Sequence, residues 1–269
     1  MNQAPQIVAI LNVTQDSFSD GGRYLASESA IEHARQLIRD GADILELGPA
    51  SSHPDAQPVS AEEQIARLGP VLDAFEDATI PISIDATNSE VIRFALRSRA
   101  VMLNDVRGFG DASLYPELAE ASASLVVVHS LLARERAVRD AASVGHVLES
   151  IDRFFSTRLD ELVRAGVHED RLIVDPGMGF FLGSNEKASL AVLRGIEVLR
   201  RRFGRPVFIS VSRKSFLQKI TGRPLEEIGA ATLAAELFAV TQGASYIRTH
   251  EPRPLRDALA VLRLLEEKD

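Results

Sequence analysis

The chain contains no cysteine among its 269 residues. Disulfide bonds and thiol chemistry are therefore excluded, which suits a protein of a reducing compartment. Positive charge is also in short supply, because 30 lysines and arginines face 38 aspartates and glutamates and leave a net charge of −8. A chain of this charge has no general attraction to nucleic acid or to anionic membranes. We expect no nucleic-acid partner and no membrane partner.

Long hydrophobic runs are absent as well, since no apolar stretch approaches the length that spans a membrane. The first residues, MNQAPQ, form no basic leader, and no linker rich in proline, glycine or serine divides the sequence. The hydrophobic fraction of 45% is sufficient for a sizeable core. These features predict a single cytoplasmic domain that extends over residues 1–269.

Short apolar runs alternate with amphipathic segments along the whole chain, which is typical of an α/β fold. The predicted strands are Ile7–Leu11, Ile44–Leu47, Ile80–Ile84, Val101–Leu103, Leu125–Val128, Leu172–Val174, Val207–Val211 and Tyr246–Ile247. Eight strands that alternate with helices favour a (β/α)₈ TIM barrel. The alternative is a doubly wound open sheet, but the first strand is not followed by Gly-x-Gly-x-x-Gly and the units are evenly spaced.

Several local signals predict where helices begin. Ser60–Glu63 and Thr87–Glu90 both have the form of a capping box, with Ser or Thr three residues before Glu. The last helix is predicted to begin at about Pro254. Residues 130–145 are charged and irregular, and we expect a long loop there after the fifth strand.

Nearly every predicted strand ends in polar or ionisable residues. These are Asn12, Glu46, Asp85, Asn104, Asp105, His129, Asp175, Ser210, Ser212, Arg213, Lys214, Arg248 and His250. A single Asp or Asn at such a position commonly caps a helix. The carboxyl ends of barrel strands converge on one mouth, however, so the whole set favours a binding site there.

Four of these residues suit one flat, polar heterocycle. Asp85, Asn104, Asp175 and Lys214 follow the third, fourth, sixth and seventh predicted strands. A 2-amino-4-oxo pyrimidine ring offers paired N–H donors to a carboxylate and a carbonyl oxygen to an ammonium or amide. Lys214 is open to two interpretations: it forms a Schiff base with a carbonyl substrate, or it acts as a fixed charge and donor.

Two segments indicate an anionic substrate. Arg248 and His250 follow the last strand and precede a helix, where barrels usually bind phosphate; the alternative for Arg248 is a functionally silent surface ion pair. The first strand leads into Asn12–Gly22, a polar loop of the kind that binds anions together with metal ions, or else an ordinary turn.

Six motifs taken together resemble one family. They are ILNVTQDSFSDGG (10–22), ISIDATNSEVI (82–92), LNDVRG (103–108), DPGMGF (175–180), SVSRKSF (210–216) and IRTHEPRPLRD (247–257). In this order they resemble the successive motifs of the dihydropteroate synthases, over essentially the whole chain. The resemblance implies a (β/α)₈ barrel in which para-aminobenzoate attacks the methylene of 6-hydroxymethyl-7,8-dihydropterin pyrophosphate. The products would be 7,8-dihydropteroate and pyrophosphate.

The resemblance also implies roles for individual residues. The implied pterin-binding residues are Asp85, Asn104, Asp175 and Lys214, of which Asp85, Asp175 and Lys214 are the catalytic ones. The implied pyrophosphate-binding residues are Asn12, Ser52, His53, Arg248 and His250, with Asn12 also binding Mg²⁺. The implied aminobenzoate-binding residues are Phe18, Pro54, Phe180, Phe181 and Ser212. A homodimer is implied as well, and Lys214 becomes a binding residue, since the reaction needs no side-chain nucleophile.

The sequence departs from the usual family pattern in the second loop and after the sixth strand. His53 replaces an arginine, Glu46 replaces an aspartate, Gln15 replaces a proline, and Phe181-Leu182 replaces Gly-Lys. These departures resemble the sulfonamide-insensitive subgroup carried on mobile elements, or a close chromosomal relative. We hypothesise that Phe181 narrows the aminobenzoate pocket against the bulkier drug. The alternative is an aromatic of the core or a lid with no discriminating role.

Two other functions compete with the synthase. A corrinoid-type pterin methyltransferase would share the barrel and the pterin carboxylates, but the chain has no Asp-x-His-x-x-Gly corrinoid motif. A non-catalytic pterin-binding paralogue is the other alternative, and it is disfavoured because Asn12, Asp175, Lys214, Arg248 and His250 are all present.

Overall fold

The computed structural model describes residues 4–13, 23–51, 57–131 and 142–266, with the side chains of 23–26 and of 266 left aside. Several sequence predictions fall outside this part. They concern Gln15, Phe18, Ser52, His53 and Pro54, and most of the loop predicted at 130–145.

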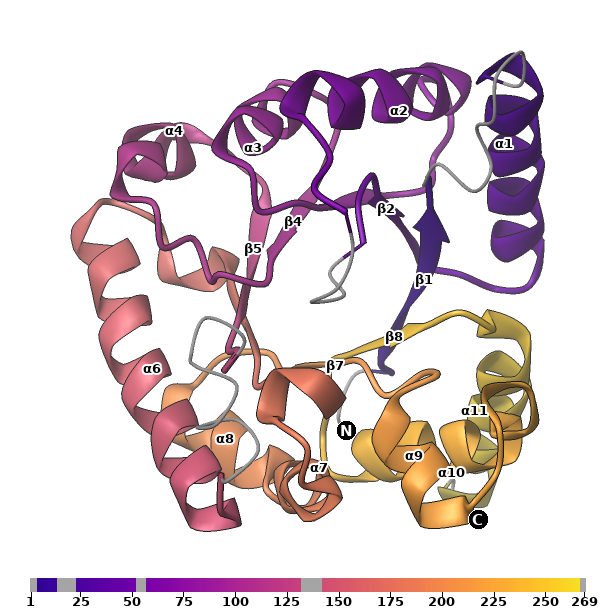
Figure 1. Ribbon diagram of the computed structural model, residues 1–269, viewed down its shortest axis with the longest axis vertical. Coiled ribbons are helices and arrows are strands. Elements are labelled where there is room, and N and C mark those ends of the chain that lie inside the picture. The colour runs from indigo at the N-terminus through magenta and orange to yellow at the C-terminus, as the bar shows by residue number, and fades with distance from the viewer. Residues whose placement is uncertain (1–3, 14–22, 52–56, 132–141, 267–269) are drawn as a thin grey trace.

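Eight parallel strands form a barrel at the centre of the molecule (Figure 1). They are β1 (Gln6–Asn12), β2 (Ile44–Gly48), β3 (Ile82–Asp85), β4 (Met102–Asp105), β5 (Ser124–Val128), β6 (Leu172–Asp175), β7 (Phe208–Ile209) and β8 (Tyr246–Thr249). The order is β6-β5-β4-β3-β2-β1-β8-β7. A bridge between Val174 and Val207 joins the two ends, so the sheet closes at β6 and β7. The predicted TIM barrel is confirmed.

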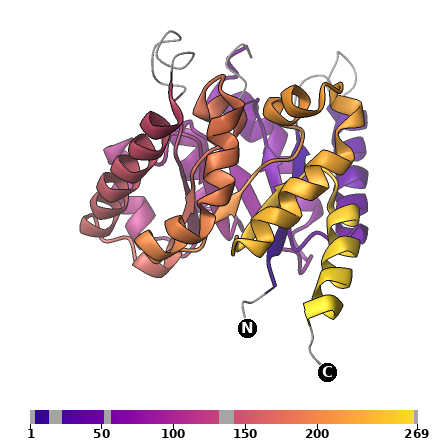
Figure 2. The ribbon, with the colours of Figure 1, turned by 90° about the horizontal axis from the view of Figure 1, so that it is seen from below.

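Helices surround the strands on the outside (Figures 1 and 2). In the described part they are α1 (Arg23–Arg39), α2 (Ala61–Ala74), α3 (Ser89–Leu96), α4 (Tyr115–Glu120), α6 (Val144–Arg164), α7 (Glu186–Arg194), α8 (Ile196–Phe203), α9 (Ser215–Thr221), α10 (Gly229–Thr241) and α11 (Pro252–Glu266). Short 3₁₀ turns are η2 (Ala112–Leu114), η3 (Glu169–Arg171), η4 (Gly179–Leu182) and η5 (Leu225–Glu227). None of the helices described is long and apolar enough to cross a membrane.

Successive side chains of each strand point to opposite faces, and this alternation divides the core in two. One cluster fills the space between strands and helices, with Leu45, Ile84 and Leu125 among its members. The second cluster lies on the other face of the strands and forms the apolar floor of the barrel. Its buried members are Val8, Ile44, Met102, Val126, Val128, Ile173 and Phe208.

Polar residues follow this floor toward the carboxyl ends of the strands. They occupy the same inward face, two positions after a floor residue: Glu46 follows Ile44, Asn104 follows Met102 and Asp175 follows Ile173. The alternation that builds the floor therefore also builds a polar ring above it.

Two predicted helix starts need correction. The helix expected to be capped by Thr87 is capped by Asn88, whose side chain accepts the Glu90 N–H at 2.9 Å, because Asn satisfies that donor from one residue closer. The last helix begins at Pro252 and not at about Pro254, since proline fits the first helical position, where no N–H is required. The cap predicted at Ser60 is confirmed by its bond to Glu63 N–H.

The last helix also closes the ring of helices. The Arg256 guanidinium donates to the Gly41 carbonyl at the end of α1, at 2.6 and 3.1 Å, and pairs with Asp43 at 2.7 Å. Asp43 in turn accepts the Ile7 N–H at 2.8 Å. One arginine thus ties the C-terminal helix to the start of the first strand.

Candidate active site

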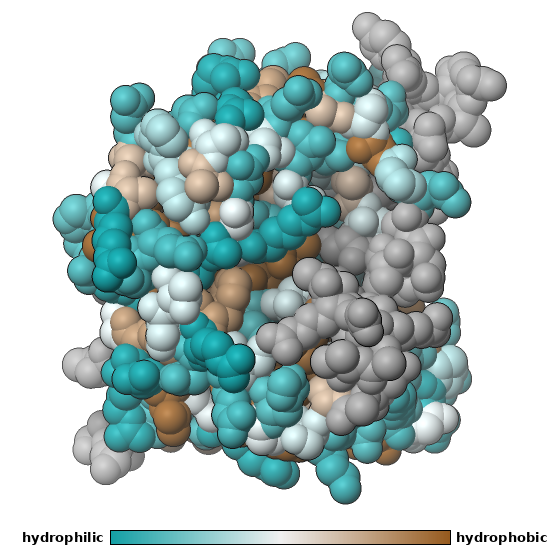
Figure 3. Space-filling view, turned by 60° about the vertical axis from the view of Figure 1, so that its left-hand side comes forward, coloured by the Kyte–Doolittle hydropathy of each residue, from teal (hydrophilic) through white to brown (hydrophobic). Residues whose placement is uncertain are grey.

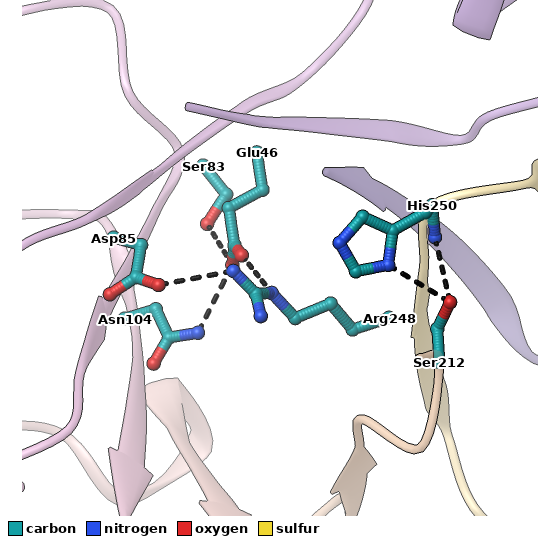
Figure 4. Close-up of polar contacts among 7 residues, drawn as sticks. All are labelled: Glu46, Ser83, Asp85, Asn104, Ser212, Arg248 and His250. Carbon is teal, nitrogen blue, oxygen red and sulfur yellow. Dashed lines mark hydrogen bonds and ion pairs between the residues drawn. The ribbon is translucent and has the colours of Figure 1, made fainter. Parts of the chain in front are cut away.

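The polar ring is organised around Glu46, whose side chain is fully buried (Figure 4). Its Oε1 accepts the Asn104 amide at 3.1 Å and the Ser83 hydroxyl at 3.4 Å. Its Oε2 accepts Nε of Arg248, and the same guanidinium donates from Nη2 to Asp85 at 3.1 Å. Four strands, β2, β3, β4 and β8, therefore meet through one carboxylate.

Arg248 lies inside the barrel mouth in this structure. Its side chain is 17% exposed and forms ion pairs with Glu46 and Asp85. The two carboxylates raise the pKa of Arg248 against the opposing effect of burial. From the sequence, Arg248 was expected to bind pyrophosphate or, as the alternative, to form an ion pair on the surface. The structure shows neither arrangement: Arg248 forms largely buried ion pairs with Glu46 and Asp85.

Asp85 and Asn104 are neighbours in register at the ends of β3 and β4. Burial raises the pKa of Asp85 to about 7, although the positive charge of Arg248 acts in the opposite direction. The Asn104 side chain donates to Glu46, while its Oδ1 is buried without a hydrogen-bond partner among the described residues. Both side chains thus have capacity for a ligand that brings N–H donors.

Asp175 ends β6 and is held by the turn that follows it. One oxygen accepts the Gly177 N–H at 2.8 Å, and burial raises the pKa of Asp175 to about 6. Gly177 has φ +75°, and a Cβ there would lie 2.4 Å from the His129 carbonyl oxygen. Only glycine fits, so the DPGMG sequence is the local requirement for this carboxylate position.

Lys214 follows β7 through a strained turn. Arg213 has φ 55°, a left-handed conformation that non-glycine residues rarely adopt, and its guanidinium pairs with Glu251 at 2.8 Å. Gly179 gives the lysine stem room, since a Cβ there would lie 3.3 Å from Lys214 Cδ. Burial and the charge of Arg248 lower the pKa of Lys214 to about 8. Its ammonium lies 4.7 Å from the centre of the Phe181 ring.

Ser212 and His250 form a second polar group beside the ring (Figure 4). The His250 backbone N–H donates to the Ser212 hydroxyl oxygen at 3.2 Å, and that oxygen lies 3.0 Å from His250 Nδ1. Burial, followed by the charges of Arg248 and Arg213, lowers the pKa of His250 to about 3. The imidazole is therefore neutral. We assign its proton to Nε2, with Ser212 as the donor to Nδ1, because the Ser212 oxygen already accepts the His250 backbone N–H.

Asn12 is the residue that, by the family resemblance, is expected to bind Mg²⁺. Its side chain is exposed at the end of β1, and Gly48 leaves room for it, since a Cβ there would lie 3.3 Å from Asn12 Oδ1. Across the described ranges no group of three or more His, Cys, Asp or Glu side chains is arranged to hold a metal ion. Asn12 thus offers one oxygen, which fits Mg²⁺ only if substrate phosphates and water complete its coordination.

The structure brings together part of the predicted site. Asp85, Asn104, Asp175, Lys214 and Arg248 interact through bonds or charge within the ring. Of the predicted aminobenzoate residues, Phe181 lies against Lys214, whereas Phe180 is 47% exposed and Ser212 bonds to His250. Phe18, Ser52, His53 and Pro54 lie outside the described residues.

The central place of Glu46 was not predicted from the sequence. The sequence marks Glu46 only as a polar residue at a strand end and as a departure from the family pattern. The signal was a charged residue in the middle of the apolar strand ILELG, a position that a protein fills with a charge only when partners compensate for it.

Comparison with known proteins agrees with this geometry. The sequence profile described as "Pterin binding enzyme" matches residues 8–250 of the chain, so the barrel and its polar mouth are those of a pterin-binding enzyme. More narrowly, the chain belongs to the dihydropteroate synthase family. It is an enzyme of the transferase class, and the family belongs to folate biosynthesis.

Three relatives support this assignment. The type-2 dihydropteroate synthase of Escherichia coli is 53% identical, over 99% of this chain and 98% of the relative. The type-1 synthase of Escherichia coli is 46% identical, over 94% of this chain and 91% of the relative. The solved structure of the Xanthomonas albilineans synthase with 4-aminobenzoic acid superposes with a TM-score of 0.89 at 31% identity, over 99% of this chain and 95% of the other.

Proposed function

We propose that the polar ring binds 6-hydroxymethyl-7,8-dihydropterin pyrophosphate and that its methylene is transferred to para-aminobenzoate. The observation that carries the proposal is the convergence of two carboxylates, one amide and two cations from five strand ends on one buried place. This set matches a ring with several N–H donors and one carbonyl oxygen.

Each residue of the polar ring at the barrel mouth has a distinct role in binding the pterin. Asp175 and Asn104 supply acceptors for ring and amino N–H groups. Lys214 supplies a donor: its ammonium lies over the Phe181 ring, and the carboxylates of Asp175 and Asp85 favour its charged form. Asp85 joins them when the pterin displaces the Arg248 guanidinium from its carboxylate.

Displacement of Arg248 also accounts for the pyrophosphate. Once released from Asp85, its guanidinium can pair with the developing charge on the leaving group, and the neutral His250 adds an Nε2–H donor. Bound Mg²⁺, held by Asn12 and by pyrophosphate oxygens, would stabilise negative charge on the leaving group. We include Ser52 and His53 among the pyrophosphate-binding residues on the family resemblance alone.

The chemical step is a substitution at one carbon. The aminobenzoate nitrogen forms a bond to the methylene carbon, the bond from that carbon to the pyrophosphate oxygen breaks with its electron pair, and the nitrogen releases one proton. The chain's residues orient both substrates and stabilise charge, and no side chain forms a covalent bond. Phe181, Phe180 and Ser212, with Phe18 and Pro54, are proposed to line the aminobenzoate position.

We also propose that the enzyme is insensitive to sulfonamides. Support comes from the sequence departures at Phe181 and in the second loop, which resemble the sulfonamide-insensitive subgroup of the family. The surface in Figure 3 is mainly hydrophilic, with apolar residues visible in a hollow near its centre.

A homodimer is proposed from the family resemblance and from exposed apolar residues on the last helix. Val261, Leu264 and Leu265 on α11 are 58%, 69% and 77% exposed. Apolar side chains in water are unfavourable, and burial against a second copy of the chain would remove this unfavourable free energy. Light scattering after size exclusion gives the mass in solution; a mass of 29.3 kDa, that of one chain, would contradict the dimer.

A pyrophosphate-release assay tests the proposed reaction. Purified enzyme receives the dihydropterin pyrophosphate and para-aminobenzoate together and separately, with Mg²⁺ or with chelator. Release only with both substrates and with Mg²⁺ supports the proposal. Methyl transfer to a corrinoid partner would favour the methyltransferase, and pterin binding without release would favour the non-catalytic paralogue.

A further inference from the structure

The Glu46 carboxylate has no role assigned by the family resemblance, and its contacts give it one. It is fully buried on β2 and accepts from residues of three other strands. Two of them, Asn104 and Arg248, are proposed pterin-site residues. A buried carboxylate that contacts the site only through other side chains acts on their orientation.

The first consequence concerns the Asn104 amide. The two ends of an amide are nearly equal in shape, so only hydrogen-bond partners decide which end faces which way. Because Nδ2 donates to Glu46 at 3.1 Å, Oδ1 points away from Glu46 (Figure 4). That oxygen is buried, and no described residue donates to it. Asn104 Oδ1 is therefore oriented to accept a hydrogen bond from an N–H group of the ligand.

The second consequence concerns Arg248. Glu46 takes Nε of the guanidinium, which leaves Nη2 for Asp85 at 3.1 Å. When a ligand takes Asp85, the guanidinium retains Glu46 as its anchor. The cation therefore stays at the wall of the site while one of its bonds is exchanged.

We propose that Glu46 is a positioning residue that orients the Asn104 amide with its oxygen toward the pterin and anchors Arg248 beside Asp85. It favours a ring with an N–H donor opposite Asn104 over one with an acceptor at that place. The inference rests on the proposed function, because the ligand has to be a pterin.

An exchange of functional groups between Glu46 and Asn104 tests the proposal. Glu46→Gln can donate to Asn104 and so reverse its amide, whereas Asn104→Asp sets two carboxylates against each other. The double variant restores one donor and one acceptor: the amide introduced at position 46 donates to one oxygen of the carboxylate introduced at position 104, and the other oxygen faces the ligand. Calorimetry with 6-hydroxymethyl-7,8-dihydropterin should give a Kd about tenfold higher for each single variant and within about threefold of wild type for the double variant.

Kinetics add a readout that a loss of structure would not produce. KM for the pterin substrate should rise in the single variants, while KM for para-aminobenzoate stays within about twofold. Glu236→Gln is the matched control, because it makes the same substitution at a buried glutamate on the outer side of the barrel. It should leave the pterin Kd within about twofold of wild type.

The outcomes separate the inference from the proposed function. Single variants that bind the pterin like wild type, or a double variant as weak as the product of the singles, would overturn the positioning role. Wild type that does not bind the pterin would overturn the proposed function itself. Where Glu46→Gln alone does not fold, Asn104→Asp and the double variant decide: a double variant that binds within about threefold of wild type supports the proposal, and one as weak as Asn104→Asp overturns it.

Discussion

The Lys214 ammonium lies 4.7 Å from the centre of the Phe181 ring, so the residue that the family pattern lacks contacts a proposed pterin-binding residue. Phe181 is partly buried against the barrel floor cluster, and its carbonyl oxygen accepts the Leu131 N–H at 2.8 Å. The backbone of Phe181 is therefore held by the segment after β5, and its ring is packed between the floor cluster and Lys214.

This packing leads to a prediction for Phe181→Gly. Inhibition by sulfamethoxazole should be weak for wild type and strong for the variant, because the clash with the drug is removed. A change of about a thousandfold corresponds to roughly 4 kcal/mol, which one steric clash can supply. Phe181→Leu, which keeps bulk without the ring, is the matched control and should give an intermediate inhibition constant. Equal constants for wild type and Phe181→Gly would contradict the role.

The ring residues predict a bell-shaped pH profile of kcat/KM. Asp175, with a pKa of about 6, must be ionised to accept pterin N–H groups, so activity rises as pH increases through this value. Lys214, with a pKa of about 8, must be protonated to donate, so activity falls above it. Asp85 titrates between them, and the acid limb therefore belongs to the coupled carboxylates. Lys214→Met should be less active and should lose the alkaline limb; an unchanged limb near pH 8 would assign it to another group.

His250 is predicted to stay neutral where free histidines titrate. With its pKa lowered to about 3, it should show no protonation in ¹⁵N NMR spectra around pH 6, and its proton should lie on Nε2. Ser212→Ala removes the donor to Nδ1 and should change the tautomer ratio without restoring the charge. A His250 signal that titrates close to 6.5 would contradict the buried neutral state.

The same shift has a consequence for stability. The unfolded chain protonates His250 below about 6.5, whereas the folded chain resists protonation down to about 3. The contribution of the neutral imidazole to the free energy of unfolding is therefore fully present above pH 6.5 and is lost as the pH falls toward 3. Urea unfolding of wild type and His250→Asn should show a difference that shrinks or reverses in acid.

Much of the fold was open to prediction because strand alternation is local. A residue such as Ile44 faces the floor and Glu46 two positions later faces the mouth, so apolar runs that end in polar residues already describe a barrel with a polar ring. Asp85 and Asn104 were predicted to end adjacent strands, and the register confirms it.

Contacts across the closed barrel could not be predicted in this way. Glu46 and Arg248 are 202 residues apart, and their contact exists only because β8 returns beside β1. The direction of the Arg248 side chain depends on which acceptors are unoccupied, which no sequence pattern records. The start of α3 was misplaced for a smaller reason, since Thr87 and Asn88 both qualify as caps and only the backbone geometry selects Asn88.

The final prediction concerns Glu236, a buried carboxyl on α10 that lies against Thr249 on the outer side of β8. It is 2% exposed and lines a cavity of about 290 Å³ with Thr232 and Glu251, and its Oε1 has no hydrogen-bond partner among the described residues. Burial raises the pKa of Glu236 from 4.5 to about 7, although a hydrogen bond from Thr249 favours the ionised form. The folded chain thus holds a proton that the unfolded chain releases.

The sign of the pH effect follows from these two values. The contribution of the protonated carboxyl to the free energy of unfolding is fully present below pH 4.5 and is lost as the pH rises through about 7. The loss amounts to about 3 kcal/mol. Glu236→Gln cannot ionise, so urea unfolding should find it close to wild type at about pH 5 and more stable than wild type at about pH 8. Glu226→Gln, at an exposed glutamate of the same cavity, should stay within about 0.5 kcal/mol of wild type at both pH values. Glu236→Gln could instead lower the free energy of unfolding by the same amount at both pH values. That result would mean that the wild-type carboxylate is stabilised as an ion, with water or a cation in the cavity as its partner.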